Sequence, residues 1–166
     1  MSEFTPIHDR VPDDEWETIV RNVPIVSVDL VVQSADGVVL GKRTNAPAKG
    51  EWFVLGGRVH KHERLTEAVY RVAREELGVD VEIVEQLGAY EHLYHTAEMD
   101  AVGGKHYLAN GFVVETDATV EELQLDDQHG DVRAFDPETL PTDLHKYTAA
   151  YLRDASSVPY AVGEQL

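Results

Sequence analysis

Residues 57–79 read GRVHKHERLTEAVYRVAREELGV. From Leu65 to Leu77 the apolar residues fall on one arc of a helix with about 3.6 residues per turn. Gly78 follows directly, where glycine commonly ends a helix in left-handed backbone. The stretch therefore predicts a loop that leads into an amphipathic helix over 65–77, packed on a core.

Glu76 is the unusual residue of this helix. At about 100° per residue its side chain points into the apolar arc, whereas Glu75 and Arg71 lie one i,i+4 step apart along the edge. A buried carboxylate without compensation is costly, so Glu76 needs a cation or a dense hydrogen-bond network opposite it. An arginine and a metal ion both satisfy this requirement, and the helix alone does not choose between them.

The spacing of the polar residues in this stretch is specific. The fixed positions are Gly57, Glu63, Arg71, Glu75, Glu76 and Gly78. They resemble the signature of the Nudix hydrolases, Gly-x5-Glu-x7-Arg-Glu-U-x-Glu-Glu-x-Gly-U, where U is a bulky apolar residue. Val72 stands where that family usually has a metal-binding Glu, and Ala73 replaces a bulky aliphatic residue. The resemblance implies an α/β fold, the Nudix α/β/α sandwich with a mixed β-sheet between helices, and hydrolase activity.

The residue types fit a hard divalent cation. Carboxylate and carbonyl oxygens suit Mg²⁺ or Mn²⁺, which keep several waters and bind through one or two carboxylates plus substrate phosphates. Gly56 and Gly57 allow the backbone to approach a ligand closely and to turn a carbonyl toward a metal. We expect Mg²⁺, with Mn²⁺ as the alternative, and a substrate pyrophosphate that completes the site.

Length and charge limit the class of protein. The 166 residues predict one domain over 1–166, with its core over about 16–155. The chain has no cysteine, which excludes disulfides, thiol nucleophiles and zinc–thiolate sites. A formal net charge of −17 argues against a nucleic-acid partner, because phosphates require the opposite sign. Such an acidic surface is typical of halophilic proteins, although a merely acidic mesophilic protein has the same composition.

The sequence also shows no membrane or secretion signal. No apolar run approaches the length of a membrane span, and the first residues lack the basic and apolar regions of a signal peptide. We therefore expect a cytoplasmic protein with no membrane partner.

Periodicity and turn residues predict the remaining elements. A short helix is expected over 15–21, strands over 25–33, 38–41, 52–55, 79–84, 87–94, 107–115 and 131–135, a closing helix over 143–154, and a tail over 156–166. The strands flank helices in an order that suits a mixed sheet between helices.

Further motifs narrow the resemblance. The sequence runs Gly-Lys-Arg-Thr-Asn over 41–45, Gly-Gly-Arg-Val over 56–59, and Gln-His-x-Asp over 128–131. These motifs look like those of the GDP-mannose mannosyl hydrolases, a similarity that covers about residues 16 to 135. In that subgroup water attacks the anomeric carbon of the sugar and GDP leaves, whereas most Nudix enzymes attack phosphorus. A small nucleotide-sugar substrate, GDP-mannose first among them, and a homodimer are what this resemblance implies.

The residues can support that chemistry. Neutralising the departing nucleoside diphosphate requires cations, and Arg43 and Arg58 offer planar forks for phosphate, with Lys42 as an added point charge. His129 is the candidate general base, because imidazole titrates near neutrality. By resemblance, the metal ligands are the Gly56 carbonyl, Glu76 and Gln128, Tyr107 binds phosphate, and Asp29 holds the sugar or orients an arginine.

Glu75 leaves alternatives open. The mannosyl hydrolases lack an acid at its position, so Glu75 could bind a second metal and direct attack to phosphorus. The chain would then be a pyrophosphohydrolase acting on a nucleoside diphosphate sugar, ADP-ribose or a nucleotide. The missing Glu at Val72 also makes a Nudix-like ligand sensor without catalysis conceivable.

Overall fold

The computed structural model describes residues 3–44, 48–97, 103–124, 129–158 and 160. The elements, in chain order, are α1 (Asp13–Asn22), β1 (Ile25–Ser34), β2 (Gly37–Arg43), β3 (Trp52–Phe53), β4 (Leu55–Arg58), α2 (Leu65–Leu77), β5 (Glu82–Tyr94), β6 (Lys105–Glu115), the short 3₁₀ helix η2 (Val120–Glu122), β7 (His129–Phe135) and α3 (Lys146–Asp154). Among these described helices, none is long and apolar enough to cross a membrane.

The strands form one mixed sheet of seven strands, in the order β3-β2-β1-β6-β5, with β4 paired to β1 and β7 to β2. Only the β1–β6 pair is parallel among the strand pairs of the described chain. β1 changes partner along its length on one side: Val32 to Ser34 pair with β2, whereas Ser27 to Leu30 pair with β4. The end of β2 is thereby separated from β1.

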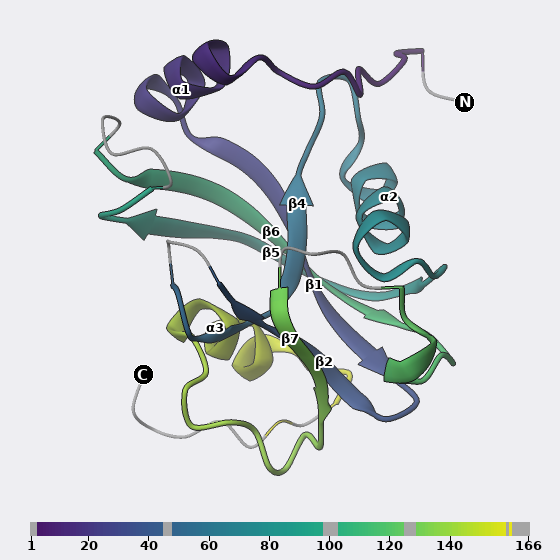
Figure 1. The fold of residues 1–166 in the computed structure, drawn as a ribbon. Coiled ribbons are helices and arrows are strands. Elements are labelled where there is room, and N and C mark those ends of the chain that lie inside the picture. Colours follow the sequence, from purple (N-terminus) through teal and green to yellow (C-terminus); the bar gives the residue numbers. More distant parts are fainter. Residues whose placement is uncertain (1–2, 45–47, 98–102, 125–128, 159, 161–166) are drawn as a thin grey trace.

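Helices cover both faces of this sheet, as Figure 1 shows with α2 and α3 on opposite sides. One buried cluster joins α2 to the face that carries Val28, Leu30 and Phe112. The other joins α3 to the face that carries Val31 and Val113. Because β1 is buried on both faces, it reads as a nearly continuous apolar run rather than an alternating one. The expected α/β/α sandwich is confirmed.

Most predicted elements are present with shifted ends. The helix over 65–77 has the predicted bounds, and Gly78 ends it at φ 67° in left-handed backbone. Two strands are expected over 79–84 and 87–94, but residues 79–81 are outside any strand and the single strand β5 runs over 82–94. Its pairing with β6 shifts between Ile83 and Glu85 and between Gln86 and Gly88. Such bulges interrupt the side-chain alternation on which strand prediction depends. The last helix begins at Lys146, after His145 as its N-cap, rather than at 143.

Candidate active site

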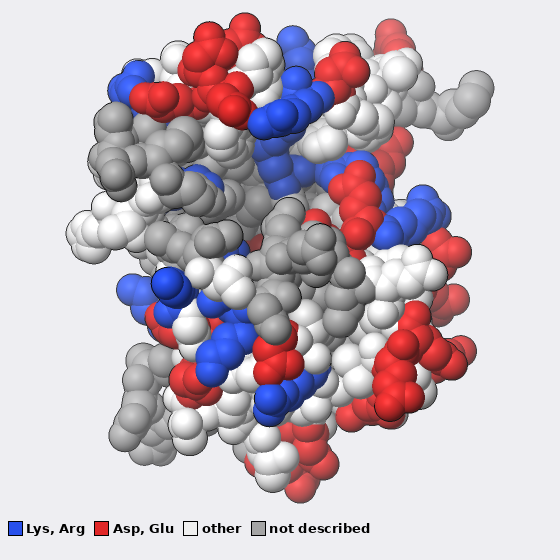
Figure 2. Space-filling view, viewed as in Figure 1, with Lys and Arg blue, Asp and Glu red and all other residues white. Residues whose placement is uncertain are grey.

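A cavity of about 440 Å³ opens between α1, α2 and the strands β1, β2, β4, β5 and β6. In Figure 2, basic side chains border the hollowed centre of a face on which acidic side chains are widespread. Nine of the residues expected at the site line this cavity: Asp29, Arg43, Gly56, Gly57, Arg58, Arg71, Glu75, Glu76 and Tyr107. The fold therefore gathers residues that are up to 78 positions apart in the sequence, from Asp29 to Tyr107.

Arg71 is the organising residue of the β4–α2 side. Its guanidinium donates to both oxygens of Glu63, at 2.6 and 2.9 Å, to Glu75 Oε2 at 2.8 Å and to the Arg58 carbonyl at 2.7 Å. Glu63 also accepts from the His60 N–H at 2.8 Å, and these donors hold the pKa of Glu63 below its usual value. Arg71 and Glu63 therefore tie the loop to helix α2.

The helix carboxylates differ in their surroundings. Glu75 is more than half exposed and pairs with Arg71, whereas Glu76 places its Oε2 atom in the protein interior. Both line the cavity beside Gly56. Carboxylate and backbone carbonyl oxygens are the donors that Mg²⁺ and Mn²⁺ prefer, so this set of residues fits a hard divalent cation.

Glycine is required at two points of the adjoining strand β4. A Cβ on Gly56 would lie 2.2 Å from Asp29 Oδ1. One on Gly57 would lie 2.9 Å from a methyl group of Val72, which is buried and itself lines the cavity. Val72 thus fills with apolar atoms the place where a further helix carboxylate would stand.

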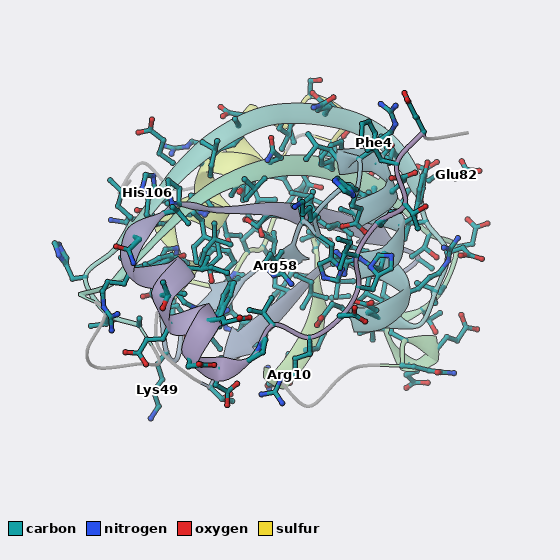
Figure 3. All side chains as sticks on the ribbon, turned by 90° about the horizontal axis from the view of Figure 1, so that it is seen from above. Phe4, Arg10, Lys49, Arg58, Glu82 and His106 are labelled. Carbon is teal, nitrogen blue, oxygen red and sulfur yellow. The ribbon has the colours of Figure 1, made fainter. Side chains whose placement is uncertain are left out.

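Two arginines face the cavity from β2 and β4. Arg58 lies over the indole of Trp16, with 5.5 Å between its Cζ atom and the ring centroid. Burial and the positive charge of Arg71 lower the pKa of Arg58. Arg43 is near enough to Asp29 to favour its charged form. Figure 3 shows Arg58 near the middle of the molecule, between α1 and α2 in that view.

Asp29 lies in a buried polar cluster at the α3 side of the cavity. Its carboxylate accepts a hydrogen bond from the Tyr151 hydroxyl at 2.7 Å, and His92 Nδ1 lies 3.8 Å away. Burial raises the pKa of Asp29 to about 6, against the opposing effects of Tyr151 and Arg43. Burial lowers the pKa of His92 to about 4, so His92 is neutral at pH 7 and forms no ion pair with Asp29 there.

Lys42 is not brought to the cavity. Lys42 is not among the residues that line it, although its neighbour Arg43 is, and the pairing of β2 with β7 shifts between these two residues. Its ammonium lies 3.4 Å from Asp143 and 5.6 Å from the centre of the Trp52 ring. The expected contribution of Lys42 to substrate binding therefore finds no support in its position.

Of the expected metal ligand Gln128 and the expected base His129, only His129 belongs to the described residues. Gln128 lies outside the described residues. For His129 the backbone is described and the side chain is not: it is the first residue of β7, paired with Arg43 of β2. Gly78, the last fixed position of the signature before Val79, caps α2 and packs against Gln124.

Several cavity residues carry no recognisable signal in the sequence. Trp16, His92 and Lys105 line it directly, and Tyr151 reaches Asp29 from α3. One indirect signal exists for Tyr151, because Gly111 in the middle of β6 leaves room for its ring, 2.6 Å from where a Cβ would stand. A lone histidine or lysine in a strand gives no such indication.

Comparison with known proteins agrees with this geometry. A family model described as the NUDIX domain matches residues 23–155. The chain belongs to the Nudix hydrolase family. Nudix hydrolases generally use divalent metals such as Mg²⁺, in keeping with the oxygen donors of this cavity.

Relatives span most of this Nudix chain. It is 53% identical over 143 residues to the low-salt glycan biosynthesis protein Agl8 of Haloferax volcanii, covering 86% of this chain and 89% of the relative. It is 31% identical over 133 residues to an ADP-ribose pyrophosphatase of Methanocaldococcus jannaschii, covering 78% and 74%. The crystal structure of a MutT NUDIX hydrolase from Burkholderia pseudomallei is similar with a TM-score of 0.65 and 27% identity, covering 80% of this chain and 98% of that one.

Proposed function

We propose that this Nudix hydrolase cleaves a nucleoside diphosphate sugar, with GDP-mannose as the preferred substrate, by attack of water on the anomeric carbon. The observation that carries the proposal is the composition of the α2 wall. Val72 is apolar and buried, and Glu75 is paired with Arg71, so Glu76 is the helix carboxylate with an interior oxygen. This arrangement suits one metal ion better than two.

A single metal ion bound to the pyrophosphate suits a reaction in which the diphosphate leaves the anomeric carbon. Glu76, the Gly56 carbonyl and Gln128 would hold the metal ion, and Glu75 is a further candidate ligand. A bound divalent cation would supply positive charge to the pyrophosphate. Arg43 and Arg58 would stabilise the charge that develops on the leaving group, because guanidinium groups bind phosphate oxygens with paired N–H donors. Tyr107, also in the cavity wall, would donate its hydroxyl to a phosphate oxygen.

The water would be activated by His129. In the proposed step the water oxygen bonds to the anomeric carbon and the bond from that carbon to the diphosphate oxygen breaks. GDP leaves with the electron pair, and the water proton passes to the imidazole. The backbone pairing of His129 with Arg43 supports this role, since Arg43 lines the cavity. The polar cluster around Asp29 offers acceptors and donors for sugar hydroxyl groups.

The position of the isotope decides between attack at carbon and attack at phosphorus. Hydrolysis of GDP-mannose in ¹⁸O-water with Mg²⁺ should place the label in free mannose and leave GDP unlabelled, as measured by mass spectrometry.

Replacing His129 by Gln should lower turnover by about 10²- to 10⁴-fold with little change in KM. The loss should shrink at low pH, where the wild-type imidazole is protonated.

Two observations favour a second function. Glu75 does line the cavity, and the chain resembles an ADP-ribose pyrophosphatase over most of its length. A pyrophosphohydrolase would yield labelled GMP or mannose 1-phosphate in the same experiment, and that result would replace the carbon-attack proposal. Absence of Mg²⁺- or Mn²⁺-dependent turnover across a panel of nucleotide sugars would leave a ligand sensor.

A further inference from the structure

We infer that the α1 end of the cavity is the base subsite of the proposed nucleotide-sugar hydrolase, and that Lys105 selects guanine there. This inference depends on the proposed function for its substrate class. The subsite is formed by Trp16 of α1, Ile25 of β1 and Lys105 of β6, all of which line the cavity. Tyr107 of β6 borders it on the side of the phosphates, so that its ring would contact the base while its hydroxyl donates to a phosphate oxygen.

Aromatic rings and aliphatic side chains surround the α1 end of the cavity. Trp16 and Tyr107 pack with Val20 and Ile25 in one small cluster, and Tyr107 is the direct sheet partner of Ile25. Aromatic side chains offer faces on which a nucleobase stacks. The opposite end differs, because Asp29 and His92 line it with hydrogen-bonding groups that suit a sugar better than an aromatic ring.

Lys105 lies where its ammonium group can donate hydrogen bonds to the edge of a base. It is 94% buried, which is rare for lysine, and its Nζ atom lies 5.6 Å from the centre of the Tyr107 ring. Lys105 has a further partner within the chain. Since an ammonium has three N–H donors, it can keep that partner and still donate to a ligand.

The distance along the sheet suits a nucleoside. Arg58 pairs with Ser27, which in turn pairs with Ala109 of β6, and Lys105 lies four residues before Ala109. At about 3.3 Å per residue, Lys105 is about 13 Å along the strand from the level of Arg58. A ribose and a base fill that span when the phosphates are at Arg58, whose stacking on Trp16 joins the phosphate region to the base region.

A side chain that has hydrogen-bond donors but no acceptor discriminates between bases. Guanine presents two neighbouring acceptors, O6 and N7, whereas adenine presents an amino donor in place of O6. Lys105 therefore favours guanine, and a matched contact of this kind contributes about 1–3 kcal/mol of discrimination, or about 5- to 150-fold in affinity. Uracil also presents an acceptor but lacks the second ring for stacking.

Binding of GDP, ADP and UDP with Mg²⁺, measured by calorimetry on the full chain, tests the assignment without any turnover. Wild-type protein should bind GDP about 5- to 150-fold more tightly than ADP, and UDP should bind less tightly than GDP. Lys105→Met should remove most of the preference by weakening GDP alone, and Lys105→Arg should restore part of it. Trp16→Leu should weaken GDP and ADP alike, and Trp16→Phe should weaken both less.

Lys146→Met is the matched control, because Lys146 also lies over a tyrosine ring, at 5.1 Å from the centre of Tyr147, but is exposed and outside the cavity. It should keep the wild-type preference. Thermal unfolding would verify that each variant is folded. A wild type that binds ADP or UDP as tightly as GDP, or a folded Lys105→Met variant that keeps the preference for GDP, would overturn the base assignment. Failure of GDP-mannose hydrolysis with an intact, Lys105-dependent preference for GDP would instead refute the proposed reaction alone.

Discussion

Asp29 imposes a pH-dependent cost on folding because its carboxylate is buried. Its pKa rises from 3.8 to about 6 in the folded protein, a difference that corresponds to about 3 kcal/mol. Between these values the folded state binds more protons than the unfolded state, so stability falls as pH rises. The contribution of the protonated group is fully present below pH 4 and is lost above pH 6.

Replacing Asp29 by Asn should remove this cost while keeping an acceptor for the Tyr151 hydroxyl. The free energy of unfolding of Asp29→Asn, relative to wild type, should therefore rise from near zero at pH 4 to about 3 kcal/mol at pH 7. Denaturant unfolding of both proteins at pH 4, 5, 6 and 7 measures the difference. A difference that stays constant over this range would show that Asp29 does not titrate as its burial implies.

The neighbouring carboxylates Glu76 and Glu75 should have unequal effects on activity. Glu76→Gln removes the charge of the interior carboxylate and should lower Mg²⁺-dependent turnover by more than about 100-fold, beyond the loss typical of groups that only support a metal ligand. Glu75→Gln, at an exposed carboxylate paired with Arg71, should lower turnover much less. Steady-state kinetics on GDP-mannose compare the two, with circular dichroism as the control for folding. Equal losses would favour two metals and attack at phosphorus.

At the scale of elements, the contact between β4 and α2 fixes the floor of the cavity. Gly57→Ala would bring a Cβ within 2.9 Å of Val72, so helix and strand must move apart, at a cost of about 1–3 kcal/mol. Val72→Ala provides room for the added methyl group, and the double variant should be less destabilised than the sum of the single variants by about 0.5–3 kcal/mol. Urea unfolding of the four proteins gives this coupling energy. Additive changes would mean that the two residues do not limit the approach of α2 to β4.

Across the whole molecule, the excess of acidic residues should make stability dependent on salt. The net charge of −17 is distributed over a surface on which acidic side chains predominate, as the visible face in Figure 2 illustrates. Repulsion between these charges extends over about 10 Å at 0.1 M salt and about 3 Å at 1 M. The unfolding temperature should therefore rise markedly between 0.1 and 2 M KCl. Calorimetry over this range of KCl measures the rise, and an unchanged midpoint would exclude charge repulsion as a major term.

The sequence by itself determined the helix over 65–77, its end at Gly78 and the spacing of Glu63, Arg71 and Glu76. These features are local: an apolar period of 3.6 residues and a glycine cap depend on neighbours within one or two turns. The family signature is readable for the same reason. The order of strands and helices was also predictable, with errors where the bulges of β5 interrupted alternation.

Only the tertiary structure decided which of the polar residues meet. Lys42 and Arg43 are neighbours in β2, yet Arg43 lines the cavity whereas Lys42 lies beside Asp143 and Trp52, and the pairing of β2 with β7 shifts between the two residues. Tyr151 is 122 residues from Asp29 in the sequence, yet its hydroxyl is the hydrogen-bond partner of that carboxylate. Lys105 gives no periodic signal, and its burial follows from the packing of α1 against the ends of β1 and β6. Local sequence sets backbone conformation, whereas pairing across the sheet and the placement of helices on it bring distant charges together, and those long-range contacts form the site.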